Sequence, residues 1–133
     1  VPSPIAARFV PSGPVYRADI LIEEIPNAIT VLEALKTYAM DQSAWRELGR
    51  TIARFHAHGI DHTDLNIRNI LFDQNSKFWL IDFDKCSQRP MGHWSQDNLA
   101  RLKRSVVKEH GKYQFQGYSS AKWQTLSDQY QLR

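Results

Sequence analysis

Three polar side chains stand at the open end of a predicted β-hairpin in the middle of the chain. Asp64 and Asn69 belong to the polar stretch "HTDLNIRN", and Asp82 lies near the end of the apolar run "FWLIDF". The runs "NILF" and "FWLIDF", with the turn "DQNSK" between them, predict the two strands. Because the first strand begins beside the end of the second, we expect the three side chains to converge. One carboxylate with an amide oxygen suits Mg²⁺, and the other carboxylate could accept a hydroxyl proton.

The spacing of these residues matches the catalytic loop of kinases. "HTDLNIRN" fits H-x-D-L-x-x-x-N in register, and "IDFD" stands where kinases carry the metal-binding D-F-G. Thr63 takes the place of an arginine that, in protein kinases, pairs with a phosphate on the activation loop, so we expect no regulation of that type. Asp84 replaces the glycine, no A-P-E follows, and the remaining residues are too few for the helical half of a protein kinase. The pattern favours a small-molecule kinase.

The sequence before the loop predicts a hairpin and two helices. The β-rich runs "IAARFV" and "YRADILIEEI" flank the breaker "PSGP", which indicates a hairpin. "TVLEALKTYAM" is typical of a short helix, with Thr30 and Glu33 as a capping box. Asp41 or Ser43 could cap a longer helix over "DQSAWRELGRTIARFHAHGI", and Gly59 suits a left-handed stop after it. This second helix carries an apolar stripe, formed by Trp45, Leu48, Ile52 and Phe55.

Two further helices are predicted after the hairpin. "NLARLKRSVVKEHG" has an apolar stripe of Leu99, Leu102 and Val106, and Gly111 is a suitable end. The tail "FQGYSSAKWQTLSDQYQLR" favours a short helix with Trp123, Leu126 and Tyr130 on one side. His56 and His58, at the end of the earlier long helix, lie two residues apart and point in different directions. Packing at a helix end therefore explains them better than metal binding does.

Composition and charge narrow the classes of protein. The net charge of +3 is uneven: residues 85–133 are strongly basic, whereas residues 1–84 are slightly acidic. This asymmetry predicts an anionic partner, although a solvated basic face would explain it as well. Nucleic acid is a weaker interpretation because no binding motif accompanies the basic residues. No apolar run approaches the ~20 residues of a membrane helix, and Cys86, the single cysteine, excludes an internal disulfide and a cysteine-based metal site.

The motifs together resemble one family of small-molecule kinases. The stretches "PIAARFV", "GPVYRADILIEEIPNA", "LGRTIARFHAHGIDHTDLNIRNIL", "LIDFDK" and "NLARLKRS" span most of the chain and are similar to the 3-deoxy-D-manno-octulosonic acid (Kdo) kinases of Gram-negative bacteria. The resemblance implies ATP-dependent phosphorylation of the 4-hydroxyl of Kdo on lipid A, in the synthesis of the lipopolysaccharide core. It also implies a peripheral protein at the cytoplasmic face of the inner membrane, with Kdo-lipid A and the anionic membrane surface as partners.

The resemblance also implies a fold and a domain organisation. We expect an α+β chain with a protein-kinase-like C-lobe, mainly helical with a catalytic β-hairpin, over residues 28–133. Residues 1–27 would supply the last N-lobe strands and the hinge, where the backbone of Glu24 and Ile25 would meet adenine. A Gly-rich loop and a phosphate-binding lysine cannot be placed in this sequence. We therefore expect a fragment that alone binds ATP poorly and is inactive.

The same resemblance assigns roles to single residues. Asp64 would be the catalytic residue that accepts or orients the sugar hydroxyl proton, with His62, Asn66 and Lys85 in support. Asn69 and Asp82, with Asp84 as a further candidate, would hold Mg²⁺ against the ATP phosphates. A basic set would meet a substrate or membrane anion, namely Arg101, Lys103, Arg104 and Lys108.

Two other functions stay open at this point. Within enzymes, an aminoglycoside-type phosphotransferase is the alternative, but cationic aminoglycosides call for acidic pockets rather than the basic helix "NLARLKRSVVK". From another class, a non-catalytic pseudokinase would serve as a binding module. The presence of Asp64, Asn69 and Asp82 together argues against it, because a degenerate site need not keep all three.

Overall fold

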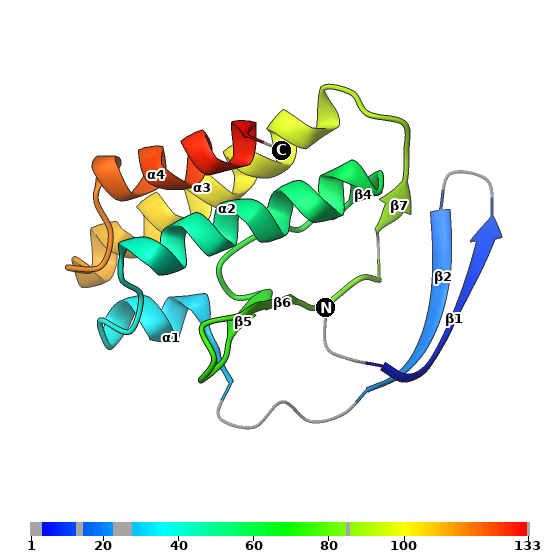
Figure 1. Ribbon diagram of the computed structural model, residues 1–133, viewed down its shortest axis with the longest axis horizontal. Coiled ribbons are helices and arrows are strands. Elements are labelled where there is room, and N and C mark those ends of the chain that lie inside the picture. The colour runs from blue at the N-terminus through cyan, green and yellow to red at the C-terminus, as the bar shows by residue number, and fades with distance from the viewer. Residues whose placement is uncertain (1–3, 13–14, 23–27, 85, 133) are drawn as a thin grey trace.

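The computed structural model describes residues 4–12, 15–22, 28–84 and 86–132 of the chain, with side chains from residue 28 onward. These residues form a mixed α/β structure of helices and small antiparallel sheets (Figure 1). The helices are α1 (Val31–Lys36), α2 (Gln42–Ala57), α3 (Trp94–Tyr113) and α4 (Ser120–Gln131). The strands are β1 (Pro4–Ser12), β2 (Val15–Ile22), β3 (Ile29–Thr30), β4 (Ile60–Asp61), β5 (Ile70–Phe72), β6 (Phe78–Leu80) and β7 (Ser87–Gln88).

Two antiparallel sheets determine where the predicted site lies. The first has the order β1-β2-β7-β4, and the second has the order β3-β5-β6. Two of the connections between the sheets follow α2: one runs from β4 to β5 through residues 62–69, and the other runs from β6 to β7. Because β4 pairs with β7 and β5 pairs with β6, the two connections run side by side. These connections carry the polar residues that the sequence singled out.

The helices form a packed body on one side of these connections. Figure 1 shows α2, α3 and α4 lying next to one another, with α1 on the far side of α2 from α4. Helices α2 and α4 approach closely at Gly49, where an added Cβ would lie 2.5 Å from the carbonyl oxygen of Leu126. Trp45, Leu48 and Ile52 are almost fully buried in the core between the helices and the second sheet. Burial of this apolar face is the main stabilisation of α2.

Most of the predicted elements are present, with shifted ends. The hairpin of β1 and β2 and the hairpin of β5 and β6 are confirmed. Asp41 caps α2 by accepting a hydrogen bond from the Ala44 N–H at 2.8 Å, and Gly59 follows the helix with φ +73°. Thr30 caps α1 through the Glu33 N–H at 3.1 Å, whereas the Glu33 carboxylate lies near Lys36 rather than completing the capping box.

Three boundaries differ from the prediction. Helix α3 begins at Trp94, four residues before the expected start, and continues past Gly111 to Tyr113, where Gln114 adopts the left-handed conformation. The strands β4 and β7 were not predicted. Each has only two residues, so neither produces a period-2 pattern, and their pairing depends on contacts between distant segments. None of the helices in the described residues is both long and apolar enough to cross a membrane.

The turn between β5 and β6 is organised by one buried carboxylate. Asp73 accepts hydrogen bonds from the backbone N–H groups of Asn75 and Lys77 at 2.8 and 2.9 Å, and from the indole N–H of Trp79 at 2.8 Å. Burial alone would raise the pKa of Asp73, but these hydrogen bonds outweigh it and hold the pKa below its usual value. The ionised carboxylate therefore stabilises the hairpin.

We expect Asp73→Ala to lower the free energy of unfolding by about 2 kcal/mol, because three partly buried hydrogen bonds to one carboxylate are lost. Since the folded-state pKa is depressed, the contribution of Asp73 is complete well above pH 4 and fades as the pH falls through the folded pKa. Urea unfolding of both proteins from pH 3 to pH 7 measures the difference. The exposed Asp128→Ala is the control and should change stability little; a difference between wild type and Asp73→Ala that does not shrink at low pH would contradict the assignment.

Candidate active site

Three carboxylates converge on a cleft between the two sheet connections. The cleft has a volume of about 440 Å³ and is lined by Thr63, Asp64, Asp82 and Asp84. Asp64 comes from the connection that follows β4, and the other two carboxylates come from the connection that follows β6. All three carboxylates are exposed to solvent. The structure therefore brings Asp64 and Asp82 together, as the hairpin argument expected.

Two amides hold Asp64 in place. Asn69 Nδ2 donates to the Asp64 carbonyl oxygen at 2.9 Å and to its Oδ2 at 3.2 Å. Asn66 Nδ2 donates to the same carbonyl at 3.1 Å and to Oδ1 at 3.2 Å. Because Asn69 uses its nitrogen on Asp64, its Oδ1 is the atom left for a cation. The amides orient the carboxylate while leaving it open to the cleft.

Asp82 follows a residue whose backbone is held on both sides. The Ile81 N–H donates to the Asn69 carbonyl at 3.0 Å, and the Ile81 carbonyl lies 2.8 Å from His62 Nε2. Asp82 then adopts φ +65°, which only a few non-glycine residues, aspartate among them, tolerate well. This turn aims the chain back toward β7. An uncommon backbone conformation at the edge of a cleft points to a functional position.

His62 is buried, and both of its ring nitrogens form hydrogen bonds with backbone groups. Its Nδ1 accepts the Asp64 N–H at 3.3 Å, so its Nε2 carries the proton that is donated to the Ile81 carbonyl. The ring also packs 5.2 Å from the ring of Phe83, measured between centroids. His62 thus joins the two connections beneath the cleft, a geometry that suits a scaffold residue rather than a base.

The loop is anchored along one face of α3, which the sequence analysis missed. The His62 N–H donates to Asn98 Oδ1 at 3.1 Å, the Ile67 N–H donates to Ser105 Oγ at 3.2 Å, and Arg68 pairs with Glu109 at 2.9 Å. The three anchors on α3 are Asn98, Ser105 and Glu109, spaced seven and four residues apart and therefore on one face. The available signal for these anchors was a row of polar residues beside the apolar stripe of Leu99, Leu102 and Val106.

The ion pair at the end of this face is partly buried. The Arg68 guanidinium beside Glu109 lowers the pKa of that carboxyl, and this effect outweighs the rise caused by burial. Lys108 and Lys112 act in the same direction. Glu109 is therefore ionised at neutral pH and fixes Arg68, whose neighbour is Asn69.

The residues present fit a magnesium ion that keeps other ligands. In residues 28–84 and 86–132, no three His, Cys, Asp or Glu side chains gather closely enough to enclose a metal ion. Asp82 and Asp84 nevertheless offer hard oxygen ligands at an open cleft, and Asn69, which donates to Asp64, has its Oδ1 left as a further oxygen. Mg²⁺ takes few ligands from protein and completes its shell with water and phosphate oxygens, so this set suits it. His56 and His58 are engaged elsewhere: His56 contacts Tyr130 and Asn98, and His58 contacts the Arg54 carbonyl.

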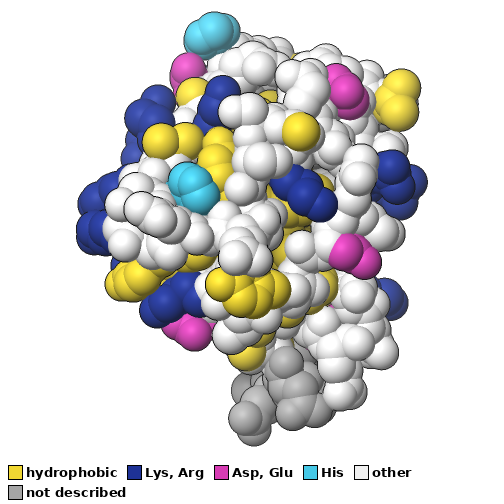
Figure 2. Space-filling model, turned by 90° about the vertical axis from the view of Figure 1, so that its left-hand side faces the viewer, with side chains coloured by type: hydrophobic (Ala, Val, Ile, Leu, Met, Phe, Trp, Pro, Cys, Tyr) yellow, Lys and Arg dark blue, Asp and Glu magenta, His cyan; other side chains and the backbone are white. Residues whose placement is uncertain are grey.

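The remaining predicted site residues lie on α3 or outside the described residues. Glu24, Ile25 and Lys85 fall outside them. All four of the predicted basic residues on α3 are exposed, but they do not share one side. Arg101 and Lys108 each follow a loop anchor by three residues, so the helix repeat places these two beside the anchor face. Arg104 and Lys103 lie farther round the helix from the anchors. Figure 2 shows Lys and Arg side chains gathered along one edge of the face that it presents.

Cys86 follows the acidic connection after β6 and is buried. Burial is the main reason that the pKa of its thiol is raised to about 12. The carboxylates of Asp61, Asp82 and Asp84 raise it in the same direction, and a hydrogen bond with the backbone of Thr63 opposes them. The thiol is therefore protonated and a poor nucleophile at neutral pH.

We expect Cys86 to resist iodoacetamide at pH 8 in the folded protein, because the thiol is both buried and protonated. Labelling in guanidinium chloride should be complete within the same time, which provides the internal control. Peptide mass mapping locates and quantifies the modification. Rapid labelling of the native protein would contradict the burial of the thiol.

The comparisons with known proteins all match one family of kinases. The model of the "Lipopolysaccharide kinase (Kdo/WaaP) family" matches residues 1–130. Among curated proteins, the chain is 49% identical over 109 residues to a 3-deoxy-D-manno-octulosonic acid kinase of Vibrio parahaemolyticus, covering 82% of the chain and 46% of that protein. Proteins of the same name match from Photobacterium profundum (43% over 132 residues, 99% of the chain, 56% of that protein) and Haemophilus influenzae (44% over 135 residues, 98% and 56%). The chain spans about half the length of these relatives.

Proposed function

Because the chain belongs to the lipopolysaccharide kinase (Kdo/WaaP) family, we propose that it carries the catalytic loop of an ATP-dependent sugar kinase. The proposed acceptor is the 4-hydroxyl of Kdo on lipid A, and the reaction is a step of lipopolysaccharide core synthesis. One observation carries the proposal: the cleft joins Asp64 to Asp82 in a chain whose matched relatives are named Kdo kinases. In this reaction the γ-phosphorus leaves the β–γ bridging oxygen and bonds to the sugar oxygen.

Asp64 is the proposed catalytic residue. The attacking hydroxyl would donate a hydrogen bond to its carboxylate and lose its proton as the new P–O bond forms. Asn66 and Asn69 hold the carboxylate from the loop side, so it faces the cleft without the reorganisation that a free side chain requires. Phosphoryl transfer depends mainly on position and on charge neutralisation, and a prepositioned carboxylate serves the first need.

Asn69 and Asp82 are the proposed ligands of Mg²⁺, with Asp84 as a further candidate. When bound, Mg²⁺ would neutralise charge on the ATP phosphates. The chain contributes the arrangement of the ligands: His62 and Asn69 clamp Ile81, and the left-handed turn at Asp82 follows directly. We extend the proposal to the lobes, with residues 28–133 as the kinase-like C-lobe and residues 1–27 as the end of the N-lobe and the hinge to adenine.

The basic residues beside the loop support an anionic acceptor at a membrane surface. Kdo carries a carboxylate and lipid A carries phosphates, so cations on the loop side of α3 are placed to meet them. The proposed location is the cytoplasmic face of the inner membrane, with the protein bound peripherally. An aminoglycoside acceptor is cationic and would be repelled by the same residues. A binding module without catalysis is the outcome if phosphate transfer is absent.

We expect Asp64→Asn to reduce kcat about 100-fold or more, because the amide cannot accept the hydroxyl proton. The full-length protein is incubated with Mg-ATP and Kdo-lipid A, and mass spectrometry detects one added phosphate. Asp97→Asn, on the exposed first turn of α3, is the matched control and should retain activity. Undiminished product from Asp64→Asn would overturn its role, and no product from the native protein would overturn the function.

We expect the double change Arg101→Gln with Lys108→Gln to raise KM for Kdo-lipid A about tenfold and to leave KM for ATP unchanged. The reason is that both cations lie beside the loop anchors, whereas the control residue Lys103 does not. The effect should shrink at high salt, because screening weakens exposed charges. Kinetics are measured on Kdo-lipid A in neutral detergent and in vesicles containing phosphatidylglycerol. An equal loss in Lys103→Gln would contradict the assignment to one side of α3.

A further inference from the structure

The segment that follows the acidic cleft is folded back onto the start of the catalytic loop. Strand β7 pairs with β4, the strand that ends where the loop begins. The Arg89 N–H donates to the Gly59 carbonyl at 2.7 Å, and an added Cβ on Gly59 would lie 2.5 Å from the Arg89 carbonyl oxygen. Gly59, with φ +73°, therefore allows the two backbones to touch.

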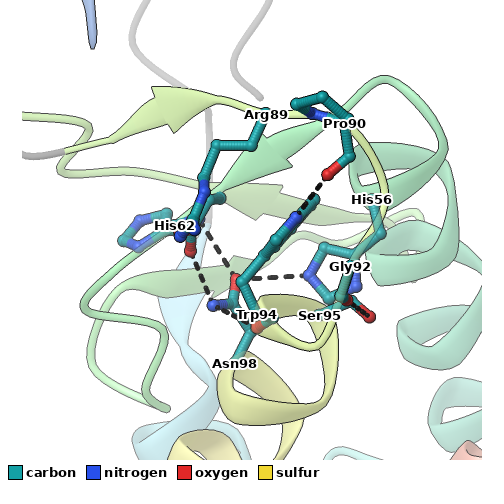
Figure 3. Close-up of polar contacts among 9 residues, drawn as sticks. His56, His62, Arg89, Pro90, Gly92, Trp94, Ser95 and Asn98 are labelled. Atoms are coloured by element: carbon teal, nitrogen blue, oxygen red, sulfur yellow. Dashed lines mark hydrogen bonds and ion pairs between the residues drawn. The ribbon is translucent and has the colours of Figure 1, made fainter. Parts of the chain in front are cut away.

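A buried carboxylate completes this contact. Asp61 has a side chain that is only 5% exposed, and its Oδ2 lies 2.9 Å from Arg89 Nη1. Its other oxygen, Oδ1, accepts from Asn98 Nδ2 at 2.8 Å. Figure 3 shows the side chains of Arg89 and Asn98 pointing toward one another. Arg89 comes from the segment after the cleft, and half of its side chain is exposed. A buried carboxylate is stable only while its cation and hydrogen-bond partners are present, so Asp61 binds the segment to the loop.

The contact is connected to the cleft through hydrogen bonds. Asn98 joins Asp61 to the backbone N–H of His62, at 3.1 Å. His62 in turn contacts the Asp64 N–H and the Ile81 carbonyl, the backbone groups next to the Asp64 and Asp82 side chains. A movement of Arg89 would therefore reach both Asp64 and Asp82 through two shared side chains.

We propose that the Asp61–Arg89 ion pair is a built-in tie that positions the catalytic loop without any covalent modification. The proposal rests on the proposed kinase function. Thr63 stands where regulated protein kinases carry the arginine that binds an activation-loop phosphate. In this chain a carboxylate two residues earlier, Asp61, binds an arginine of the segment instead. The charges are reversed relative to the phosphate-dependent contact, and neither group has to be added by a modification.

The test compares Arg89→Gln, Arg89→Lys, Asp61→Asn and the double variant Asp61→Asn/Arg89→Gln in the full-length protein. Arg54→Gln is the matched control, because Arg54 forms an exposed ion pair with Glu47 on α2 and does not line the cleft. We expect Arg89→Gln to lower kcat between about 10-fold and 100-fold, with KM for ATP changed less than about threefold, since misplacement of the loop acts on the chemical step. Arg89→Lys should restore most of kcat, and the double variant should be no worse than the single variants.

Hydrogen exchange measures the tie without relying on activity. We expect the amides of residues 86–91 to exchange faster in Arg89→Gln than in the native protein, with α2 and α4 unchanged. Normal kcat in Arg89→Gln, or unchanged exchange over residues 86–91, would overturn the proposal. Equal acceleration throughout α2 and α4 would overturn it as well, because the pair would then serve only global stability. A native protein that phosphorylates no Kdo-lipid A would overturn the proposed function, and the exchange comparison would still decide the tie.

Discussion

The side-chain amide of Asn98 is the interaction on which the rest of the site depends. It is buried, and all of its hydrogen-bonding capacity is used: Oδ1 meets the His62 N–H and His56 Nε2, and Nδ2 meets Asp61 Oδ1 and the Trp94 carbonyl. Replacing Asn98 by aspartate would remove both N–H donors of the amide, and replacing it by leucine would remove all four of these hydrogen bonds. One amide thereby attaches the start of the loop to α3, and Ser105 and Glu109 continue the attachment along the same helix face.

The polar loop is compatible with a folded core because its backbone groups form hydrogen bonds within the loop and to α3. Leu65, Ile67 and Ile70 are buried and point into the core, while the polar side chains between them hydrogen-bond to the loop itself or to α3. Apolar packing against the core therefore stabilises the loop, and the hydrogen bonds of the amides determine its conformation. The carboxylates at the cleft remain exposed, so the site avoids the large desolvation penalty of buried charges.

The sequence predicted the parts of the structure that leave a local pattern. Helix α2, the hairpin of β5 and β6, and the approach of Asp64 to Asp82 follow from periodicity, turn residues and the geometry of a hairpin. The anchors on α3 and the pair of Asp61 with Arg89 could not be found this way, because they join residues that are 28 to 41 positions apart. The two-residue strands β4 and β7 depend on the same distant contacts. The roles assigned to Asp64, Asn69 and Asp82 stay predictions.

The left-handed backbone of Asp82 restricts the residue types at that position independently of any chemical role in the cleft. Aspartate, asparagine and glycine are the residues that adopt this conformation most readily, so the position is constrained by the shape of the chain as well as by its chemistry. Asp64 has no such backbone restriction. If a related chain lost the proposed activity but kept this fold, the backbone would still restrict position 82 to a few residue types, whereas position 64 would not be restricted in this way. Of the two carboxylates, Asp64 is therefore the more informative position when the proposed activity is judged from a sequence.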